Sequence, residues 1–306
     1  MATQGGFHEG EIAVQRRAGV RADAQRLEGM LDPADLSGGA GRFLALRTFA
    51  VLTGRDRDDT LWISPLTGRP GFLDGAGTVL RVGALPPNGD PLSGLSIPQQ
   101  VGLLVIDFAT RRRMRINGEL FEYGDAGLAV SVQQAYGNCP QYIQQRVLAV
   151  DDTMTAAHEP VVTTGAALSA DDQHLVRAAD TFFLGTSHPD RGSDASHRGG
   201  SPGFVRVDSP TSLWWPDYPG NNMFNSFGNL AVDDTAALLF ANFDTGATLH
   251  LSGNARLEWS TPGTSGDDGN VGRRVHFEIR QVVSGRLLGA HTDGGVLHYP
   301  HNPPLL

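Results

Sequence analysis

Cysteine and long apolar runs are nearly absent from this chain of 306 residues. Cys139 is its single cysteine, so an intramolecular disulfide is excluded. No segment approaches the roughly 18 consecutive apolar residues that mark a membrane-spanning helix. Glycines and polar residues between Gly5 and Glu9 interrupt the N-terminus, which is unlike a secretory leader. We therefore expect a cytoplasmic protein in a reducing compartment, with no membrane partner.

Positive charge and several familiar motifs are also scarce. The chain has 24 lysines and arginines against 33 aspartates and glutamates, which gives a formal net charge of −9. This balance argues against a nucleic-acid partner, which needs a basic surface. No Gly-x-Gly-x-x-Gly follows a strand, and no histidine or cysteine spacing is typical of a metal site. We therefore expect neither a Rossmann-bound nicotinamide nor a bound metal.

Short sequences recur in the same order in the two halves of the chain, at offsets between 132 and 135 residues. This period is too long for a solenoid repeat of about 20–50 residues, so we expect a duplicated domain, with halves at 1–155 and 156–306. A duplication of this kind indicates a fused two-fold dimer, whose shared site would lie at the interface. The recurring sequences are Thr48–Phe49 and Thr181–Phe182, Pro70–Phe72 and Pro202–Phe204, Leu103–Leu104 and Leu238–Leu239, and Gly118 and Gly253.

Apolar or β-branched runs bounded by turn residues predict a mainly β chain. Helices are expected only over 11–31 and 170–179 and briefly after Asn222, with a linker around 150–161 and an irregular tail from His291. Many short antiparallel strands with few helices favour two barrels side by side. The expected strands are 49–52, 61–64, 79–82, 102–108, 114–116 and 128–132 in the first half, and 182–185, 204–207, 212–215, 236–240, 248–251, 255–259 and 275–283 in the second.

The segment 187–204 carries the densest set of chemically useful side chains. Within it, Ser196, His197 and Arg198 come directly before Gly199 and a second glycine. Small residues let a flat ligand approach the backbone, and a guanidinium can bind a phosphate through two hydrogen bonds.

A second polar segment, 216–230, leads into the short predicted helix and contains Asn222, Asn225 and Ser226. Together with Arg198, this segment predicts a pocket for a phosphate monoester. The same residue types are also typical of turns, which leaves a purely structural role open.

The second half resembles the pyridoxamine 5′-phosphate oxidase-like family of FMN-binding split barrels. The resemblance is carried by Ser-x-Arg-Gly-x-x-Pro-Gly-Phe between two strands, then by Pro-Asp-x-x-Gly-Asn, a short helix and an apolar Leu-Leu-Phe strand. It covers Asp180–Trp259, and Phe43–Gly118 matches more loosely. The resemblance implies tandem FMN-binding split β-barrels packed as an internal pseudo-dimer, with a few peripheral helices and FMN at the shared interface.

The resemblance also implies which residues hold FMN. It puts the phosphate on Arg198 and the ring against the backbone and small side chains of both halves. The loop-helix lysine and the C-terminal Arg-Pro-x-x-Trp-Gly signature of the vitamin-pathway enzyme are absent, so synthesis of pyridoxal phosphate is not expected. The remaining implied contacts are Asn222, Asn225 and Ser226 for the phosphate, and Ser196, His197, Gly199, Ser64, Pro65 and Thr67 for the ring.

Arginine is concentrated near the end of the first half. Arg111, Arg113 and Arg115 would share one face of an alternating strand. They either form a solvated strand edge or reach the interface, where they would bind an anionic substrate or cofactor. Cys139 and Tyr142 lie at the start of a helix-like stretch. The thiol of Cys139 is either reactive or buried as a small apolar group. Tyr142 either lines a pocket or packs in the interior.

The expected function is that of an FMN-dependent oxidoreductase acting on an unidentified small molecule, with an electron-donor partner as an option. The alternatives are a flavin-binding or flavin-storing protein without turnover, and a haem-binding relative ligated by a histidine of the tail. We expect one FMN per chain, because Asp90 at the matching place of the first half would repel a phosphate. The ring would reach toward Trp62–Thr67, in a monomeric pseudo-dimer or a homodimer.

Overall fold

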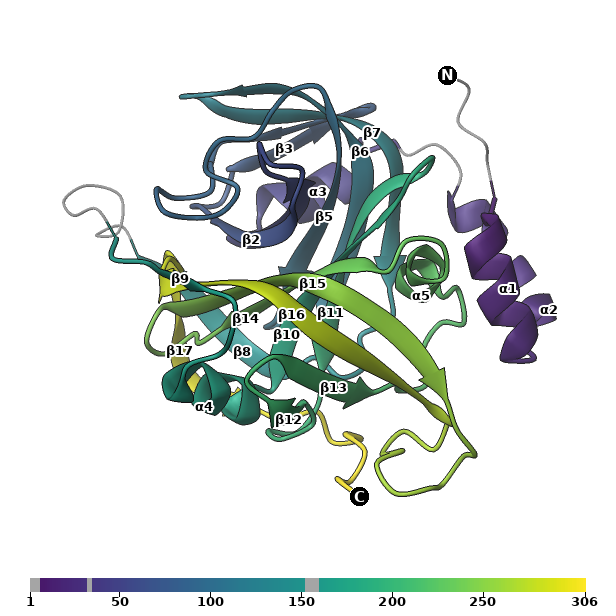
Figure 1. Ribbon diagram of the computed structural model, residues 1–306. Coiled ribbons are helices and arrows are strands. Elements are labelled where there is room, and N and C mark those ends of the chain that lie inside the picture. The colour runs from purple at the N-terminus through teal and green to yellow at the C-terminus, as the bar shows by residue number, and fades with distance from the viewer. Residues whose placement is uncertain (1–5, 32–34, 152–159) are drawn as a thin grey trace.

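The computed structural model describes residues 6–31, 35–151 and 160–306. Two antiparallel sheets make up most of the molecule, and short helices lie at its edges (Figure 1). The chain is therefore mainly β with a few peripheral helices, as its sequence predicts. Among the described residues, no helix is long and apolar enough to cross a membrane.

The first sheet contains seven strands in the order β2-β1-β5-β6-β7-β4-β3, and every neighbouring pair is antiparallel. All the strands predicted for this half are present, most of them longer than predicted, and β3 is an additional one. Their bounds are β1 Phe49–Arg55, β2 Leu61–Thr67, β3 Leu73–Ala76, β4 Val79–Val82, β5 Gln99–Asp107, β6 Arg112–Gly124 and β7 Gly127–Asn138.

The second sheet runs in the order β11-β10-β14-β15-β16-β13-β12, and β9 pairs with β16 beside this path. The strand predicted over 204–207 lies slightly later, and those predicted over 248–251 and 255–259 form one continuous strand, β15. The bounds are β9 Thr163–Gly165, β10 Thr181–His188, β11 Gly192–Gly199, β12 Arg206–Ser209, β13 Ser212–Pro216, β14 Thr235–Ala241, β15 Ala247–Trp259 and β16 Arg273–Arg286.

The two sheets share one strand order, in which β1-β2 correspond to β10-β11 and β5-β6-β7 correspond to β14-β15-β16. Ser64 on β2 and Ser196 on β11 occupy the same register against their neighbouring strands. A β-bulge follows Asn117 between β6 and β7, and an equivalent bulge follows Ser252 between β15 and β16. Equal order, register and bulges are what a duplication would leave, while the boundary between two domains stays a prediction.

The six described helices are short and lie outside the sheets. They include α4 and α5, close to the predicted positions, but the single helix predicted over 11–31 is wrong. Gly19 adopts a φ of 73°, a left-handed conformation that ends a helix, and three shorter elements replace the predicted one. The bounds are α1 Glu9–Arg17, α2 Arg21–Gln25, the 3-10 helix η1 Glu28–Leu31, α3 Gly39–Ala45, α4 Ala170–Ala178 and α5 Asn225–Leu230.

Two further expectations about irregular or helical segments are also wrong. The tail forms strand β17, Ala290–Leu297, which pairs with β8, Gln145–Val150, with a shift in register that absorbs its glycines. The described residues 139–151 contain no helix, because Tyr142 adopts a φ of 62°, which a right-handed helix cannot continue. The predicted linker, 150–161, falls largely outside the described residues.

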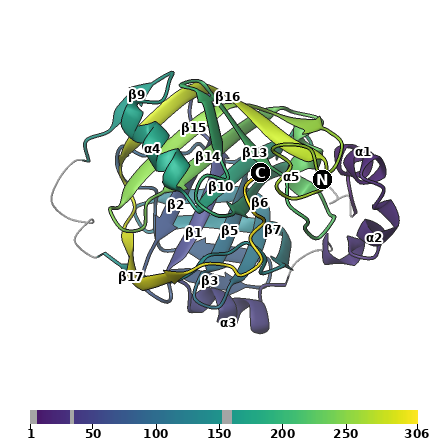
Figure 2. The ribbon, with the colours of Figure 1, turned by 90° about the horizontal axis from the view of Figure 1, so that it is seen from below.

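The strands at the centre of the molecule are buried on both faces. Leu103 and Leu238 point into the separate cores of the first and second sheets, whereas Leu104 and Leu239 point into a third cluster that both halves share. Figure 2 shows the blue strands of the first sheet beneath the green strands of the second. The repeated Leu-Leu pair therefore has one leucine for each face of its strand.

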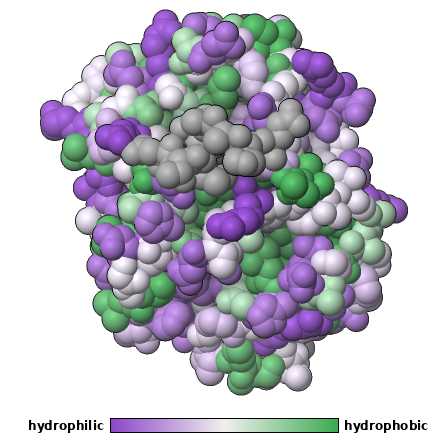
Figure 3. Space-filling view, turned by 90° about the vertical axis from the view of Figure 1, so that its left-hand side faces the viewer, coloured by the Kyte–Doolittle hydropathy of each residue, from purple (hydrophilic) through white to green (hydrophobic). Residues whose placement is uncertain are grey.

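Large apolar side chains at the surface are scattered. Figure 3 shows hydrophilic and hydrophobic residues interspersed over one face of the molecule. The most exposed large apolar side chains are Val161, Leu297 and Leu46, at 88%, 63% and 65%, and they come from different segments. Single exposed apolar residues are common on folded proteins, so these define no docking surface.

The two sheets approach each other most closely where β5 crosses β11. A Cβ atom placed on Gly102 would lie 2.7 Å from the carbonyl oxygen of Ser193 and 2.6 Å from the Cα of Asp194. Both neighbours are backbone atoms, which cannot swing away as the end of a side chain can. Glycine at this position is therefore a condition for the contact between the halves.

We predict that Gly102→Ala lowers the free energy of unfolding by about 1–3 kcal/mol, because the added methyl group forces β5 and β11 apart. Urea unfolding measures this change. Gly39→Ala is the matched control, since a Cβ there meets no atom within 4 Å and alanine favours the helix α3. Equal effects of the two substitutions would contradict the close contact between the sheets.

Candidate functional site

A cleft with two adjoining depressions lies where the end of β11 meets β6 and β7 of the other sheet. The first depression has a volume of about 680 Å³ and the second about 420 Å³, both counted with the open space at their mouths. The second half also contributes α5 and the segment before it. Both depressions are lined by Arg115, Arg198, Asp217, Tyr218, Gly220 and Asn221, so they form one continuous site.

Most residues singled out from the sequence lie in this cleft. The first depression brings together His197, Gly199 and Arg198 with three residues of the first half, which are Arg113, Cys139 and Tyr142. The second depression contains Asn222, Asn225 and Ser226, again beside Arg198. The cleft therefore joins both predicted polar segments to the arginine-rich strand of the other half.

Three guanidinium groups converge in the cleft. Arg115 donates a hydrogen bond of 2.8 Å to Asp194 and forms an ion pair with it. The buried Nε atoms of Arg113, Arg115 and Arg198 have no hydrogen-bond partner among the described residues. Burial, followed by the charge of Arg115, lowers the pKa of Arg113 to about 9, and burial lowers that of Arg198 to about 10, although Asp217 acts in the opposite direction. These groups remain charged at neutral pH, but their charge is poorly compensated.

The balance of charge around the cleft is positive. Arg273 pairs with Asp217 at 2.8 Å and lines the second depression. Among the described residues, the cleft has four arginines and two carboxylates that line it or pair with them, an excess of two positive charges. The arginines are Arg113, Arg115, Arg198 and Arg273, and the carboxylates are Asp194 and Asp217. A dianion would neutralise this excess.

His197 is neutral and held in one orientation. The side chain is 4% exposed, and its Nδ1 atom lies 2.9 Å from Nη1 of Arg113. Burial, with the charges of Arg113 and Arg198, lowers the pKa of His197 well below its usual value. Its Nε2 atom is buried without a partner among the described residues.

Ser196 lies beneath the cleft and does not line it. The hydroxyl of Ser226 donates toward Ser196 and Asp194, at 3.2 Å in each case. Ser196 is therefore in contact with a residue of the second depression, and its own side chain is fully buried. It supports the floor of the site.

Ser64, Pro65 and Thr67 are not brought into either depression. Ser64 donates a hydrogen bond of 2.5 Å to the buried Asp90, whose other oxygen faces Nε2 of His250 at 3.7 Å. His250 on β15 occupies the strand position that corresponds to Arg115 on β6, because each faces the second leucine of the repeated pair. Ser64, Asp90 and His250 thus fill the position that corresponds, in the duplicated arrangement, to the cleft. This geometry does not support the expected approach of the flavin ring to residues 62–67.

Arg111 and Cys139 differ from the sequence expectations. Arg111 lies in the turn before β6 with a φ of 53°, so it does not share the strand face of Arg113. Its guanidinium donates to the carbonyl oxygens of Ile143 and Leu297 and thereby ties down the tail. Cys139 is a free, half-buried thiol that lines the first depression, with no helix after it.

Aromatic rings form one side of the first depression. The ring of Tyr142 lies 5.0 Å from that of Tyr218 and 5.6 Å from that of Tyr299, and its hydroxyl donates to the carbonyl oxygen of Pro219. Tyr142 is thus both packed and part of the pocket wall, as the two sequence interpretations allow. Sequence reasoning did not select Tyr218, Arg273 or Asn138, since their contribution depends on contacts between distant segments.

The N-terminal helix supports α5, which forms one wall of the second depression. A Cβ atom on Gly10 would lie 2.1 Å from the carbonyl oxygen of Gly228, so the two helices touch through their backbones. The side chain of Asn225 donates a hydrogen bond of 2.6 Å to Glu11, and Gln15 donates one of 2.9 Å to the carbonyl oxygen of Met223. The sequence carries no signal for this contact, because neither helix has a marked apolar stripe.

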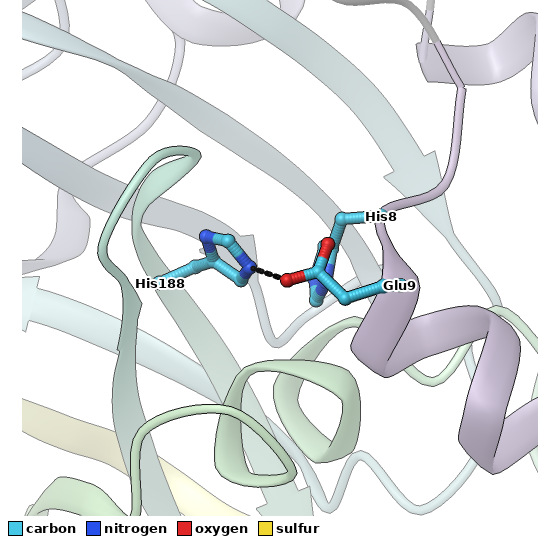
Figure 4. A group of neighbouring side chains, drawn as sticks. All are labelled: His8, Glu9 and His188. Atoms are coloured by element: carbon cyan, nitrogen blue, oxygen red, sulfur yellow. Dashed lines mark hydrogen bonds and ion pairs between the residues drawn. The ribbon is translucent and has the colours of Figure 1, made fainter.

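A second group of polar residues, His8, Glu9 and His188, lies behind α5 (Figure 4). Their ligand atoms are within 4.8 Å of one another, a spacing that would suit a metal ion. In both histidines, however, Nδ1 accepts a backbone N–H, which puts the proton of the neutral ring on Nε2. Nε2 of His188 then donates to Glu9 at 3.2 Å and has no free lone pair for a metal. We assign the group to packing of the N-terminal helix.

Comparison with known proteins adds little beyond the fold. No family model matches this chain, and no curated protein matches it. Solved structures that resemble part of it include the HupZ protein of Group A Streptococcus, at 8% identity over 42% of this chain and 99% of that one, with a TM-score of 0.32.

Two further matches have descriptions that name an oxidase family or a cofactor. One is a protein related to general stress protein 26, of the pyridoxinephosphate oxidase family, from Clostridium acetobutylicum, at 16% identity over 40% of this chain and 91% of that one, with a TM-score of 0.30. The other is the FAD binding protein of Mycobacterium smegmatis, at 12% identity over 41% and 98%, with a TM-score of 0.27. Such weak similarity transfers neither a cofactor nor an activity to this chain.

The burial of Glu11 generates a prediction about pH. Burial raises the pKa of Glu11 from its usual 4.5 to about 7, so the folded chain binds a proton more tightly than the unfolded chain does. The stability linked to this proton is present below about pH 4.5 and is lost as the pH rises through 7, by an amount on the order of 3 kcal/mol. Urea unfolding between about pH 5 and 8 should therefore show that the unfolding free energy of the wild type falls relative to that of Glu11→Gln as the pH rises.

Glu9→Gln is the matched control for this measurement, because Glu9 lies on the same helix with a side chain that is 72% exposed. It should leave the pH dependence close to that of the wild type. Identical curves for Glu11→Gln and the wild type would show that Glu11 is ionised in the folded chain throughout this range.

Proposed function

We propose that this chain binds FMN in the cleft, with the phosphate in the second depression and the ring in the first. The observation that carries the proposal is the set of buried arginine Nε atoms without partners, together with two uncompensated positive charges. A phosphate monoester carries close to two negative charges at neutral pH and presents three strong acceptor oxygens. It would satisfy both the donors and the charge.

The residues of the second depression fit a phosphate. Arg198 and Arg115 border both depressions, and Arg273 lines the second. Asn222 and Ser226 add neutral polar groups beside them. Arginine binds phosphate oxygens through paired N–H groups, so this arrangement would fix both the position and the orientation of a phosphate.

The first depression fits a planar ring. Gly199 lines it without a side chain, and the aromatic residues Tyr142 and Tyr218 line it as well. His197 and Asn138 line the same space, and each has a buried polar atom without a partner among the described residues.

A bound flavin would supply electron transfer. The residues of the chain would bind and orient the cofactor and exclude water from one face of it. We propose that the chain is an oxidoreductase acting on a small molecule, in which an electron donor or the substrate itself reduces the flavin. Loaded protein that is reduced by no donor and reoxidised by no acceptor would instead be a flavin-storing protein.

We also propose that the two halves form an internal pseudo-dimer with a single cofactor site. The shared strand order supports a duplication. A single cofactor site is supported by the different residues, Arg115 and His250, at corresponding positions of the two sheets. Where the cleft has a charged arginine, the other half has a buried imidazole beside Asp90. A carboxylate in that place would repel a phosphate.

A haem ligand is not favoured by the histidines of this chain. His197 lines the cleft, but ligation through Nε2 would require its neutral ring to lose its proton. The tail histidines, His291, His298 and His301, are exposed and do not line the cleft.

We predict that Arg198→Ala weakens FMN binding by about 1.5–3 kcal/mol, a roughly ten- to hundredfold rise in Kd, because a charge-assisted contact with the phosphate is lost. Fluorescence titration with FMN measures Kd. Arg112→Ala is the control, since Arg112 is exposed and lies against Phe43 away from the cleft. Equal losses at Arg198 and Arg112 would contradict the assignment of the phosphate, and no binding by the wild type at tens of micromolar would overturn the proposed cofactor.

We further predict one FMN per chain. Protein saturated with FMN, freed of excess ligand and then denatured should release flavin in a ratio close to one. The reason is that Ser64, Asp90 and His250 close the corresponding place in the other half. A ratio close to two would show that both halves bind.

A further inference from the structure

The geometry points to His197 as a fixed hydrogen-bond donor to the ring bound in the first depression, with Arg113 as the residue that fixes it. This inference rests on the proposed function and deepens it, since it assigns one atom of the chain to the electron-accepting part of the cofactor. The assignment follows from the surroundings of the imidazole, its tautomer and its charge.

The imidazole is held by contacts from both halves of the chain. His197 lies on β11, and the centroids of Phe183 and Phe108 are 6.0 Å and 6.3 Å from that of its ring, both in edge-to-face geometry. Nη1 of Arg113 reaches Nδ1 at 2.9 Å from β6 of the other sheet. Rotation of this buried ring would break the hydrogen bond.

The contact with Arg113 determines where the proton lies. A guanidinium donates hydrogen bonds and accepts none, so Nδ1 must be the acceptor. The proton of the neutral ring is therefore on Nε2. This atom is buried without a partner among the described residues, and His197 lines the first depression. A ligand that brings an acceptor atom there would relieve an unpaired donor, which is costly to bury.

The charges around His197 keep it in this form. Arg113 on β6, Arg198 on β11 and Arg146 on β8 all lower its pKa, in addition to the effect of burial. No acidic side chain contributes to the shift, so nothing favours a second proton. The Nε2–H donor is therefore expected to persist unchanged across the neutral pH range.

A donor in this position favours a reduced ring over an oxidised one. A flavin ring gains negative charge when it takes up electrons, and fixed donors aimed at developing charge stabilise it. The guanidinium of Arg113 adds a positive charge behind the imidazole. The chain should therefore bind reduced FMN more tightly than oxidised FMN, which raises the reduction potential of the bound cofactor.

The test compares the midpoint potentials of FMN bound to the wild type, His197→Phe and His197→Gln. His197→Phe removes the donor but suits neighbours that are themselves phenyl rings, and it should reduce the preference for reduced FMN about tenfold, equivalent to about 30 mV for two electrons. His197→Gln retains an N–H donor and should recover most of the preference. His174→Gln, on the exposed side of α4, is the control and should not change the potential.

Three results distinguish a failure of the inference about His197 from a failure of FMN binding. An unchanged potential in His197→Phe, with FMN bound and the melting temperature of the wild type retained, would overturn the inference while leaving FMN binding intact. A wild-type potential that follows an imidazole titration between about pH 6 and 8 would also overturn it. Failure of the wild type to bind FMN would overturn the proposed function, and nitrogen-15 spectra of the chain alone would then test the tautomer, with a proton on Nδ1 contradicting the assignment.

Discussion

Burial of arginine charge between the two sheets is the constraint on which the site depends. Removing a guanidinium from water costs several kcal/mol unless its charge is paired and its donors are satisfied. Arg115 meets this condition in part through Asp194, whereas Arg113 contacts the imidazole of His197 and Arg198 the ring of Phe227, and neither forms an ion pair with a carboxylate of the described residues. The chain retains a local arrangement that is unfavourable without an anion, which is typical of a binding site.

The surrounding fold keeps these charges close together. Leu104 and Leu239 anchor the central strands in a core shared by both halves, and Gly102 allows β5 to approach β11. The N-terminal helix then braces α5 through Glu11 and Gln15, so the wall of the second depression does not depend on loop residues alone. Arginines that would repel one another in a flexible site are thereby held in place by apolar burial elsewhere.

Much of the architecture could be predicted from the sequence, because apolar alternation and turn residues are local signals. The repeated Leu103–Leu104 and Leu238–Leu239 located the strands that are buried on both faces. Strand β11 was missed, since Gly192–Gly199 is mostly polar and its side chains meet the other half instead of an apolar core. Apolar alternation does not predict a strand whose side chains form a binding site instead of an apolar core.

The candidate site could be predicted only where its residues cluster along the chain. Arg198 and Asn225 lie in two dense polar segments and were recognised, whereas Arg273 reaches the cleft from a distant strand and carries no local motif. Ser64 is the reverse case, a residue that was expected in the site and does not line it. The register of Ser64 matches that of Ser196, but β15 of the other sheet has His250 where β6 has Arg115. This difference becomes visible only when the strand pairings of the two sheets are compared.

The measurement that tests the account most directly is a comparison of FMN with riboflavin, which has the same ring and no phosphate. Isothermal titration of the full chain should show FMN binding at least about tenfold more tightly, and this advantage should shrink as salt screens the arginines. Equal affinities for the two ligands, at low as well as high salt, would contradict the central claim that buried arginines form a phosphate site.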